Sequence, residues 1–147
     1  MSKLISLTNQ NGGVGKTTSS VDLAVSFAVS AVKTLLIDLD PQSNAPTGIE
    51  DLIVEPKGSI YDAIIRGSST KDVITNTKLD FLDIVTSNSD LVGAEVELVG
   101  IMAREFQLEK VLKPIIKKYD YILIDCPPSL GLLTLNALTC SNSVIIP

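Results

Sequence analysis

The segment Asn11-Gly12-Gly13-Val14-Gly15-Lys16-Thr17-Thr18 does most to narrow the fold of this 147-residue chain. It follows an apolar run at residues 4–8 that is typical of a buried strand, and it precedes apolar residues at helical spacing. Its three glycines allow successive backbone N–H groups to point at one anion, and the helix N-terminus adds the positive end of its dipole. Strand, loop and helix in this order predict a phosphate-binding loop.

The side chains of this loop point to a nucleoside triphosphate with a metal ion. Lys16 can reach the β- and γ-phosphates, and the Thr17 hydroxyl can ligate Mg²⁺. The loop departs from the general G-x-x-x-x-G-K-T form, because Gln10 stands at the first glycine position. We predict that the whole loop binds the nucleotide, through Asn11, Gly12, Gly13, Val14, Gly15, Lys16, Thr17 and Thr18.

Three aspartates follow apolar, strand-like runs. Asp38 and Asp40 come at the end of the run 34–38, and Asp125 ends the run 121–125. Ligands of open α/β sheets bind at the carboxyl ends of the strands, so we expect these carboxylates to converge near the phosphates. Bound Mg²⁺ would offset their repulsion, and the predicted metal ligands are therefore Thr17, Asp38 and Asp125. The alternative is that the aspartates only cap strand ends.

The remaining pattern predicts an α/β fold of the P-loop NTPase type, a mostly parallel sheet with helices on both faces. Residues 1–147 have the size of a single domain. The last predicted strand has no helix after it to cover it, so we expect this domain to be truncated at its C-terminus. The predicted strands are 4–8, 34–38, 81–85, 121–125 and 143–146; the predicted helices include the stripe Val21, Ala24, Val25, Ala28 and Val32, a start capped by Ser59, and residues 91–98 and 104–118, kinked at Pro114.

Composition excludes several other classes. The chain has no histidine, which rules out Ser-His-Asp hydrolysis and zinc sites built on histidine. Its two cysteines, Cys126 and Cys140, are too few for a disulfide scaffold, and we interpret both as inert thiols. No apolar run reaches the roughly 18 residues of a membrane helix, and the first residues lack the features of a signal peptide. We therefore expect a cytoplasmic protein.

At these residues the chain resembles the ParA/Soj/MinD family of P-loop ATPases with a deviant Walker A motif. The similar segments are residues 9–18, 36–42 and 119–138, and the segment Leu91 to Leu98 is similar to the Soj/ParA branch. The resemblance implies ATP and Mg²⁺ as cofactors, and a homodimer that forms on ATP binding. It also implies DNA binding without sequence preference, a ParB-type partner protein, and a role in chromosome or plasmid partitioning at the nucleoid.

The resemblance also implies roles for individual residues. Lys16 would be the phosphate lysine and Asp40 the residue that orients the attacking water, and these two are the predicted catalytic residues. Asp38 would belong to the first switch and Asp125 to Walker B. Residues 127–129, Pro-Pro-Ser, would form the second switch.

One departure from the family concerns Asn11. The family's signature lysine, which reaches the partner's nucleotide across the dimer, falls at this position. A cation supplied in trans is worth about 10³–10⁵ in rate, so we predict weak or absent hydrolysis with phosphate binding retained. Two alternatives to a partitioning ATPase remain: a nucleotide-binding module that does not hydrolyse ATP, and a non-functional truncated remnant. Membrane attachment of the MinD kind is disfavoured, because we identify no C-terminal amphipathic helix.

Overall fold

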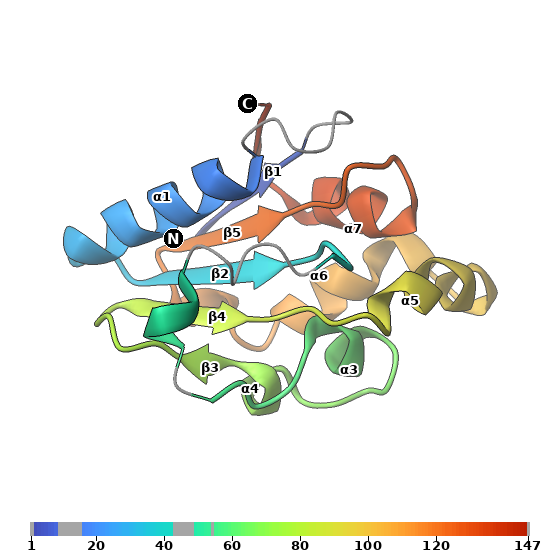
Figure 1. Cartoon of the computed structure of the whole chain (residues 1–147). Helices are drawn as coiled ribbons and strands as arrows, with labels where there is room; N and C mark the ends of the chain where they lie inside the picture. The colour runs from blue at the N-terminus through green and yellow to red at the C-terminus, as the bar shows by residue number, and fades with distance from the viewer. Residues whose placement is uncertain (1, 9–15, 43–48, 54, 147) are drawn as a thin grey trace.

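Six strands form one sheet within the part of the chain that the structure describes (Figure 1). The structure is a computed structural model, and it describes residues 2–8, 16–42, 49–53 and 55–146, with the backbone alone for 16–18. The strand order is β3-β4-β2-β5-β1-β6, and every pairing is parallel except that of β3 with β4. The strands are β1 (Lys3–Leu7), β2 (Thr34–Asp38), β3 (Thr75–Asn76), β4 (Leu82–Val85), β5 (Tyr121–Asp125) and β6 (Ser143–Ile145).

Helices cover both faces of this sheet, which confirms the predicted fold class. Helix α1 packs on one face, and α3 to α7 gather on the other. The α-helices are α1 (Lys16–Val29), α3 (Ile60–Ile64), α4 (Thr70–Val73), α5 (Leu91–Glu97), α6 (Gln107–Leu112) and α7 (Leu132–Cys140). Short 3₁₀ helices are η1 (Glu50–Leu52), η2 (Leu98–Gly100), η3 (Arg104–Phe106) and η4 (Ile116–Lys118). None of the helices described here is long and apolar enough to cross a membrane.

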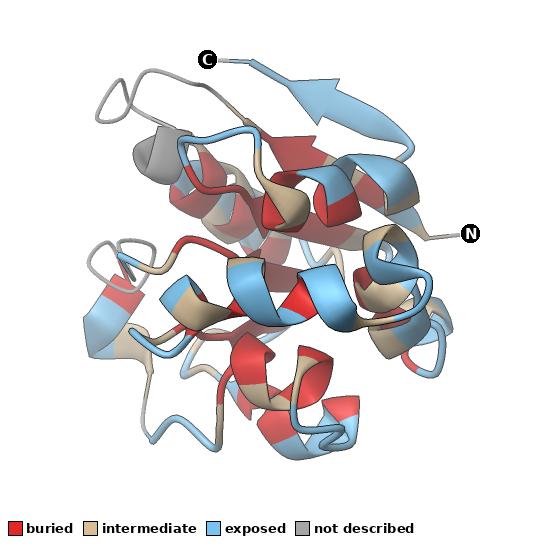
Figure 2. Cartoon of the chain, turned by 90° about the vertical axis from the view of Figure 1, so that its right-hand side faces the viewer, coloured by how far each residue is buried: buried red, intermediate tan, exposed pale blue. Residues whose placement is uncertain are grey.

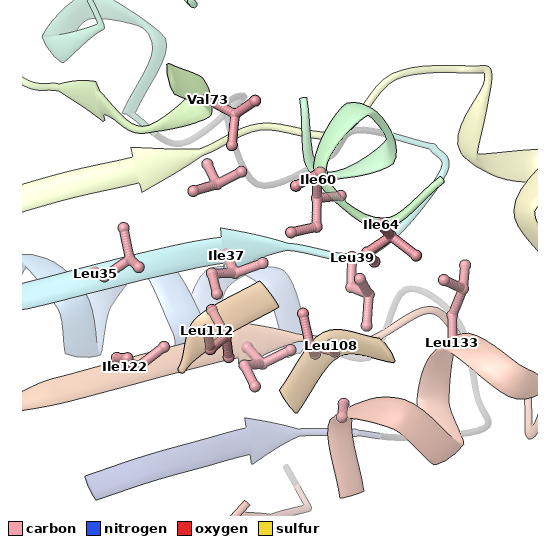
Figure 3. Packing of buried hydrophobic residues seen from close by; sticks show 14 of the residues in the cluster. Leu35, Ile37, Leu39, Ile60, Ile64, Val73, Leu108, Leu112, Ile122 and Leu133 are labelled. Carbon is pink, nitrogen blue, oxygen red and sulfur yellow. The ribbon is translucent and has the colours of Figure 1, made fainter. Parts of the chain in front are cut away.

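The central strands are apolar on both faces, because helices cover both sides of the sheet. On β2, Leu35 and Ile37 face the cluster under α3 to α7, where Leu108 and Leu112 of α6 pack (Figure 3). Leu36 faces the other way, into the cluster under α1. Each such leucine or isoleucine is fully buried and contributes about 1.5–3 kcal/mol to folding.

All five predicted strands are present, but two helix predictions were wrong in their bounds. Helix α1 ends at Val29, so Val32 lies outside it, and Ala31 has a positive φ of 61°. The segment 104–118 is broken rather than kinked, because α6 ends at Leu112. Pro114 has no N–H to donate to a carbonyl of the preceding turn, so the helix does not continue through it. The next helical segment is the short 3₁₀ helix η4.

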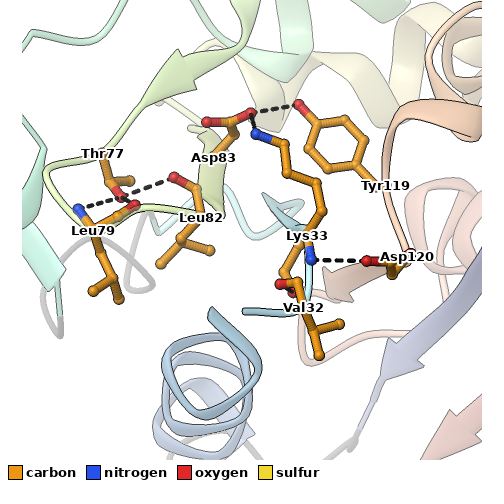
Figure 4. A network of polar contacts seen from close by, with 9 residues as sticks. Val32, Lys33, Thr77, Leu79, Leu82, Asp83, Tyr119 and Asp120 are labelled. Carbon is orange, nitrogen blue, oxygen red and sulfur yellow. Dashed lines mark hydrogen bonds and ion pairs between the residues drawn. The ribbon is translucent and has the colours of Figure 1, made fainter. Parts of the chain in front are cut away.

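A polar network holds together the amino edge of the sheet, where the strands begin (Figure 4). The Tyr119 hydroxyl donates to Asp83 Oδ2 at 2.7 Å, and Lys33 Nζ lies 3.5 Å from the same oxygen. The backbone N–H of Lys33 donates to Asp120 at 2.9 Å. Burial, and then the hydrogen bond to Asp83, raise the pKa of Tyr119 well above its ordinary value, so the phenol stays a donor. The network joins the starts of β2, β4 and β5.

The edge strand β6 differs from the rest of the sheet in being exposed (Figure 2). It pairs with β1 through the register Ile5 to Ser143 and Leu7 to Ile145. Val144 is 45% exposed and Ile145 is 38% exposed. The sheet therefore ends in a strand that carries apolar side chains into solvent.

Candidate nucleotide-binding site

The carboxyl edge of the sheet brings together residues from three strands that are far apart in sequence. β5 lies between β1 and β2, and Asp125 is in register with Leu7 on one side and Asp38 on the other. Both aspartates are fully buried. Hydrogen bonds continue the pairing past the strand ends: Leu39 N–H donates to the Asp125 carbonyl at 2.9 Å, and Cys126 N–H to the Leu7 carbonyl at 3.0 Å. The two carboxylates are therefore held side by side.

Asp40 lies beside this pair and is only 3% exposed. Its backbone N–H donates to Asp38 Oδ1 at 3.0 Å, and its own Oδ1 accepts the N–H of Gln42 at 3.0 Å. From the end of β4, the Ser87 hydroxyl donates to the Asp40 carbonyl at 2.5 Å. These hydrogen bonds fix the backbone at Asp40 and Gln42, and the bond from Gln42 also sets the direction of the Asp40 carboxylate.

The predicted phosphate loop is described only at its two ends. Asn11, Gly12, Gly13, Val14 and Gly15 lie outside the described residues, as do the side chains of Lys16, Thr17 and Thr18. On one side, β1 ends at Leu7 next to Asp125; on the other, α1 begins at Lys16. In Figure 1 the start of α1 lies near the tip of β1, and the helix runs back along the sheet. The described segments on either side of the loop thus lie at the carboxyl edge of the sheet.

A second loop, residues 127–131, leads from Asp125 to α7. The Thr134 hydroxyl donates to the Ser129 carbonyl at 2.6 Å. The first two amides of α7, those of Leu132 and Leu133, donate to the carboxylate of Glu95 on α5 at 2.6 and 3.2 Å. Neither Ser87 nor Glu95 was predicted from the sequence. The only signal for Glu95 was its place in the segment 91–98 that carries the family resemblance.

The donor set suits a magnesium ion that is shared with phosphates. Mg²⁺ prefers oxygen ligands, and it is usually held by one or two carboxylates together with substrate phosphates and water. Asp38 and Asp125 offer two adjacent carboxylates. Across the described residues, no three acidic or cysteine side chains are grouped so that they could hold a metal ion alone. Two carboxylates are as many as the protein usually gives to a magnesium ion that also binds phosphates.

The two cysteines have no features of a reactive centre. Cys126 is buried directly after Asp125. Cys140 is the last residue of α7 and is partly buried. Burial raises the pKa of Cys140 to about 11, so its thiol stays protonated at neutral pH.

Comparison with known proteins finds a protein family that matches this chain. A family model described as an AAA domain matches residues 2–147. The sporulation initiation inhibitor protein Soj of Bacillus subtilis is 46% identical over 147 residues, and the chromosome partitioning protein ParA of Myxococcus xanthus is 48% identical over 145. These matches cover 100% and 99% of this chain, but 58% and 51% of the two proteins. The chain therefore spans about half the length of the curated relatives it matches.

Solved structures share the same arrangement. Cobyrinic acid a,c-diamide synthase from Mycobacterium smegmatis, with bound ADP and magnesium, matches with a TM-score of 0.91 at 33% identity. A plasmid partition protein from Borrelia burgdorferi B31, bound to AMPPNP, matches with a TM-score of 0.89 at 35% identity. Both matches cover 100% of this chain and 60% or 61% of the solved chain.

Proposed function

This chain belongs to the AAA domain family, among the ParA/Soj P-loop ATPases, and we propose that it binds Mg²⁺ and ATP to serve chromosome or plasmid partitioning. The observation that carries the proposal is the pair Asp38 and Asp125, buried in register at the carboxyl ends of β2 and β5. A pair of buried carboxylates is costly unless positive charge lies close by. A magnesium nucleotide and Lys16 are the groups that would supply it.

Each predicted residue has a place in this proposal. The loop Asn11–Thr18 and the start of α1 would bind the phosphates, with Lys16 on the β- and γ-phosphates. Thr17, Asp38 and Asp125 would hold Mg²⁺, which neutralises charge on the phosphates when it is bound. Asp40 would orient the attacking water, and its fixed backbone is what such a role requires.

Asn11 favours a second candidate, a module that binds ATP without turning it over. Asparagine carries no charge and is shorter than lysine, so it cannot supply a cation to the nucleotide of a partner subunit. Binding would persist, because the groups on the same chain remain. In either case we expect an ATP-dependent homodimer, a ParB-type partner and nonspecific DNA as the interactions of the partitioning role, in the cytoplasm at the nucleoid.

Binding of a fluorescent ATP analogue tests the proposal directly. We expect saturable binding with Mg²⁺, and weaker binding after EDTA removes the metal. Lys16→Ala should weaken binding by roughly 10–100-fold, because it removes charge-assisted hydrogen bonds of about 1.5–3 kcal/mol. Lys3→Ala is the matched control, since Lys3 is the exposed first residue of β1, at the opposite edge of the sheet. Absence of binding by the unmodified chain would contradict the proposal and favour the non-functional remnant.

A further inference from the structure

The segment that follows β4 touches both loops at the carboxyl edge. At its start, Ser87 donates to the Asp40 carbonyl at 2.5 Å. Farther along, in α5, the Glu95 carboxylate accepts the amides of Leu132 and Leu133 at 2.6 and 3.2 Å. One short stretch of chain is therefore bonded to the loop after β2 and to the helix that follows the loop after β5. The nucleotide-binding proposal gives this stretch no role.

Glu95 performs for α7 the task that an N-cap side chain usually performs. The first amides of a helix have no acceptor within the helix. The N-cap of α7 is Gly131, which has no side chain to offer one. Glu95 supplies the acceptor from a neighbouring helix, and places negative charge at the positive end of the α7 dipole.

Gly131 leaves the room that this contact needs. A Cβ built on Gly131 would lie 2.5 Å from Glu95 Oε2 and 2.6 Å from Oε1. The backbone of Gly131 itself is extended, with φ −78° and ψ −169°, so alanine can adopt its conformation. Alanine at position 131 would therefore displace the carboxylate without straining its own backbone.

The loop between Asp125 and α7 depends on where α7 begins. Thr134, in the first turn of α7, holds the Ser129 carbonyl at 2.6 Å. Movement of the helix start would therefore carry the loop with it. Glu95 fixes that start to α5, and this contact links the position of residues 127–131 to α5.

We propose that Glu95 is a positioning residue: its carboxylate latches the start of α7 to α5 and thereby sets the conformation of loop 127–131 beside Asp125. The inference rests on the proposed function in one respect, since the loop matters for a nucleotide bound at that aspartate. Glu97 offers a matched control on the same helix. Its carboxylate accepts the Tyr61 hydroxyl at 2.9 and 3.0 Å and so faces α3 instead of α7.

Amide hydrogen exchange on the nucleotide-free chain tests the latch itself. Glu95→Ala should raise the exchange rates of the Leu132 and Leu133 amides by roughly tenfold, while Glu97→Ala leaves them unchanged. Gly131→Ala should give a similar rise, and the double variant should show no further rise, because both changes remove one contact. Fully additive effects, or equal effects of Glu95→Ala and Glu97→Ala, would overturn the latch.

Affinity for a fluorescent ATP analogue with Mg²⁺ tests the positioning role, at a temperature where every variant is folded. Glu95→Ala should weaken binding by roughly tenfold, which is about 1.4 kcal/mol, and Glu97→Ala by less than about twofold. Glu95→Gln, which keeps an acceptor oxygen, should restore part of the affinity. Faster exchange with unchanged affinity would make Glu95 a structural cap and overturn its positioning role. If the unmodified chain binds no nucleotide, the proposed function fails, whereas the exchange cycle still decides the latch.

Discussion

At the scale of single residues, Asn11 is the position at which we predict the loss of ATP turnover. The residues proposed to bind metal and phosphate, the buried aspartates and the start of α1, lie on this chain. A cation that enters from a second subunit acts on charge that develops during phosphoryl transfer, so its loss lowers turnover and leaves binding in place. We therefore predict that the side chain at position 11 affects turnover and not binding.

Replacing this asparagine with lysine tests that separation. We expect Asn11→Lys to raise steady-state ATP turnover by roughly 10³-fold with little change in affinity for the ATP analogue, because the added cation acts in the transition state. The measurement is phosphate release, with and without DNA. Asn11→Gln lengthens the side chain without charge and serves as the control. Unchanged turnover in Asn11→Lys would show that Asn11 is not what limits hydrolysis.

At the scale of elements, α7 carries a buried side-chain amide that bonds to neighbouring helices. Asn136, 1% exposed, accepts the Leu108 N–H at 3.0 Å and donates to the carbonyls of Arg104 at 2.9 Å and Leu132 at 2.8 Å. These bonds join the starts of α6 and η3 to α7. The bond from the Leu108 N–H also gives an acceptor to a donor that the start of α6 leaves without a partner inside the helix.

Removing this amide should therefore destabilise the fold. We expect Asn136→Ala to lower the free energy of unfolding by about 2–4 kcal/mol, since it leaves the Leu108 N–H and the Arg104 carbonyl without these partners. Urea denaturation measures the change. Thr139→Ala, which removes an exposed hydroxyl bonded within the same helix, should change stability by less than about 0.5 kcal/mol. Equal losses in the two variants would refute this role for Asn136.

Elements with regular apolar patterns could be predicted, and those with irregular ones could not. The runs 34–38 and 121–125 are buried on both faces, so every residue in them except the last is apolar or β-branched. Helix α7 was not predicted, because its buried face is not uniformly apolar. That face includes the polar residues Thr134 and Asn136, whereas the apolar Leu135 is 45% exposed. β3 has two residues and carries no periodicity.

The residues of the candidate site also fall into those that could be predicted from the sequence and those that could not. Asp38 and Asp125 could be placed together from the sequence, because both end strands of a parallel sheet. The contacts of Ser87 and Glu95 depend on how α5 and the end of β4 pack against distant segments, which no local spacing encodes. The roles assigned to Lys16, Thr17 and Asp40 stay predictions.

At the scale of the whole molecule, we predict that the exposed edge strand β6 promotes association between copies of this chain. An apolar strand edge is a template for pairing with another chain, and a charged side chain on the edge blunts it. We expect Val144→Lys to reduce light scattering at tens of micromolar protein while leaving the melting temperature nearly unchanged. Val29→Lys, 70% exposed on α1, adds the same charge away from the edge and should have little effect. Equal scattering by Val144→Lys and the unmodified chain would rule out β6 as the contact.

The position of β5 between β1 and β2 also bears on the order of folding. β1 and β2 come from the first part of the chain, yet they do not pair with each other, and both pair with β5, a strand near the other end. Closing such long loops is slow, because the chain loses conformational entropy before the strand contacts form and offset the loss. Asp38 and Asp125 meet only when that step is complete. A nucleotide that needs both carboxylates would therefore bind only chains in which β5 is already in the sheet. It would stabilise these chains and not the partly folded ones that lack β5.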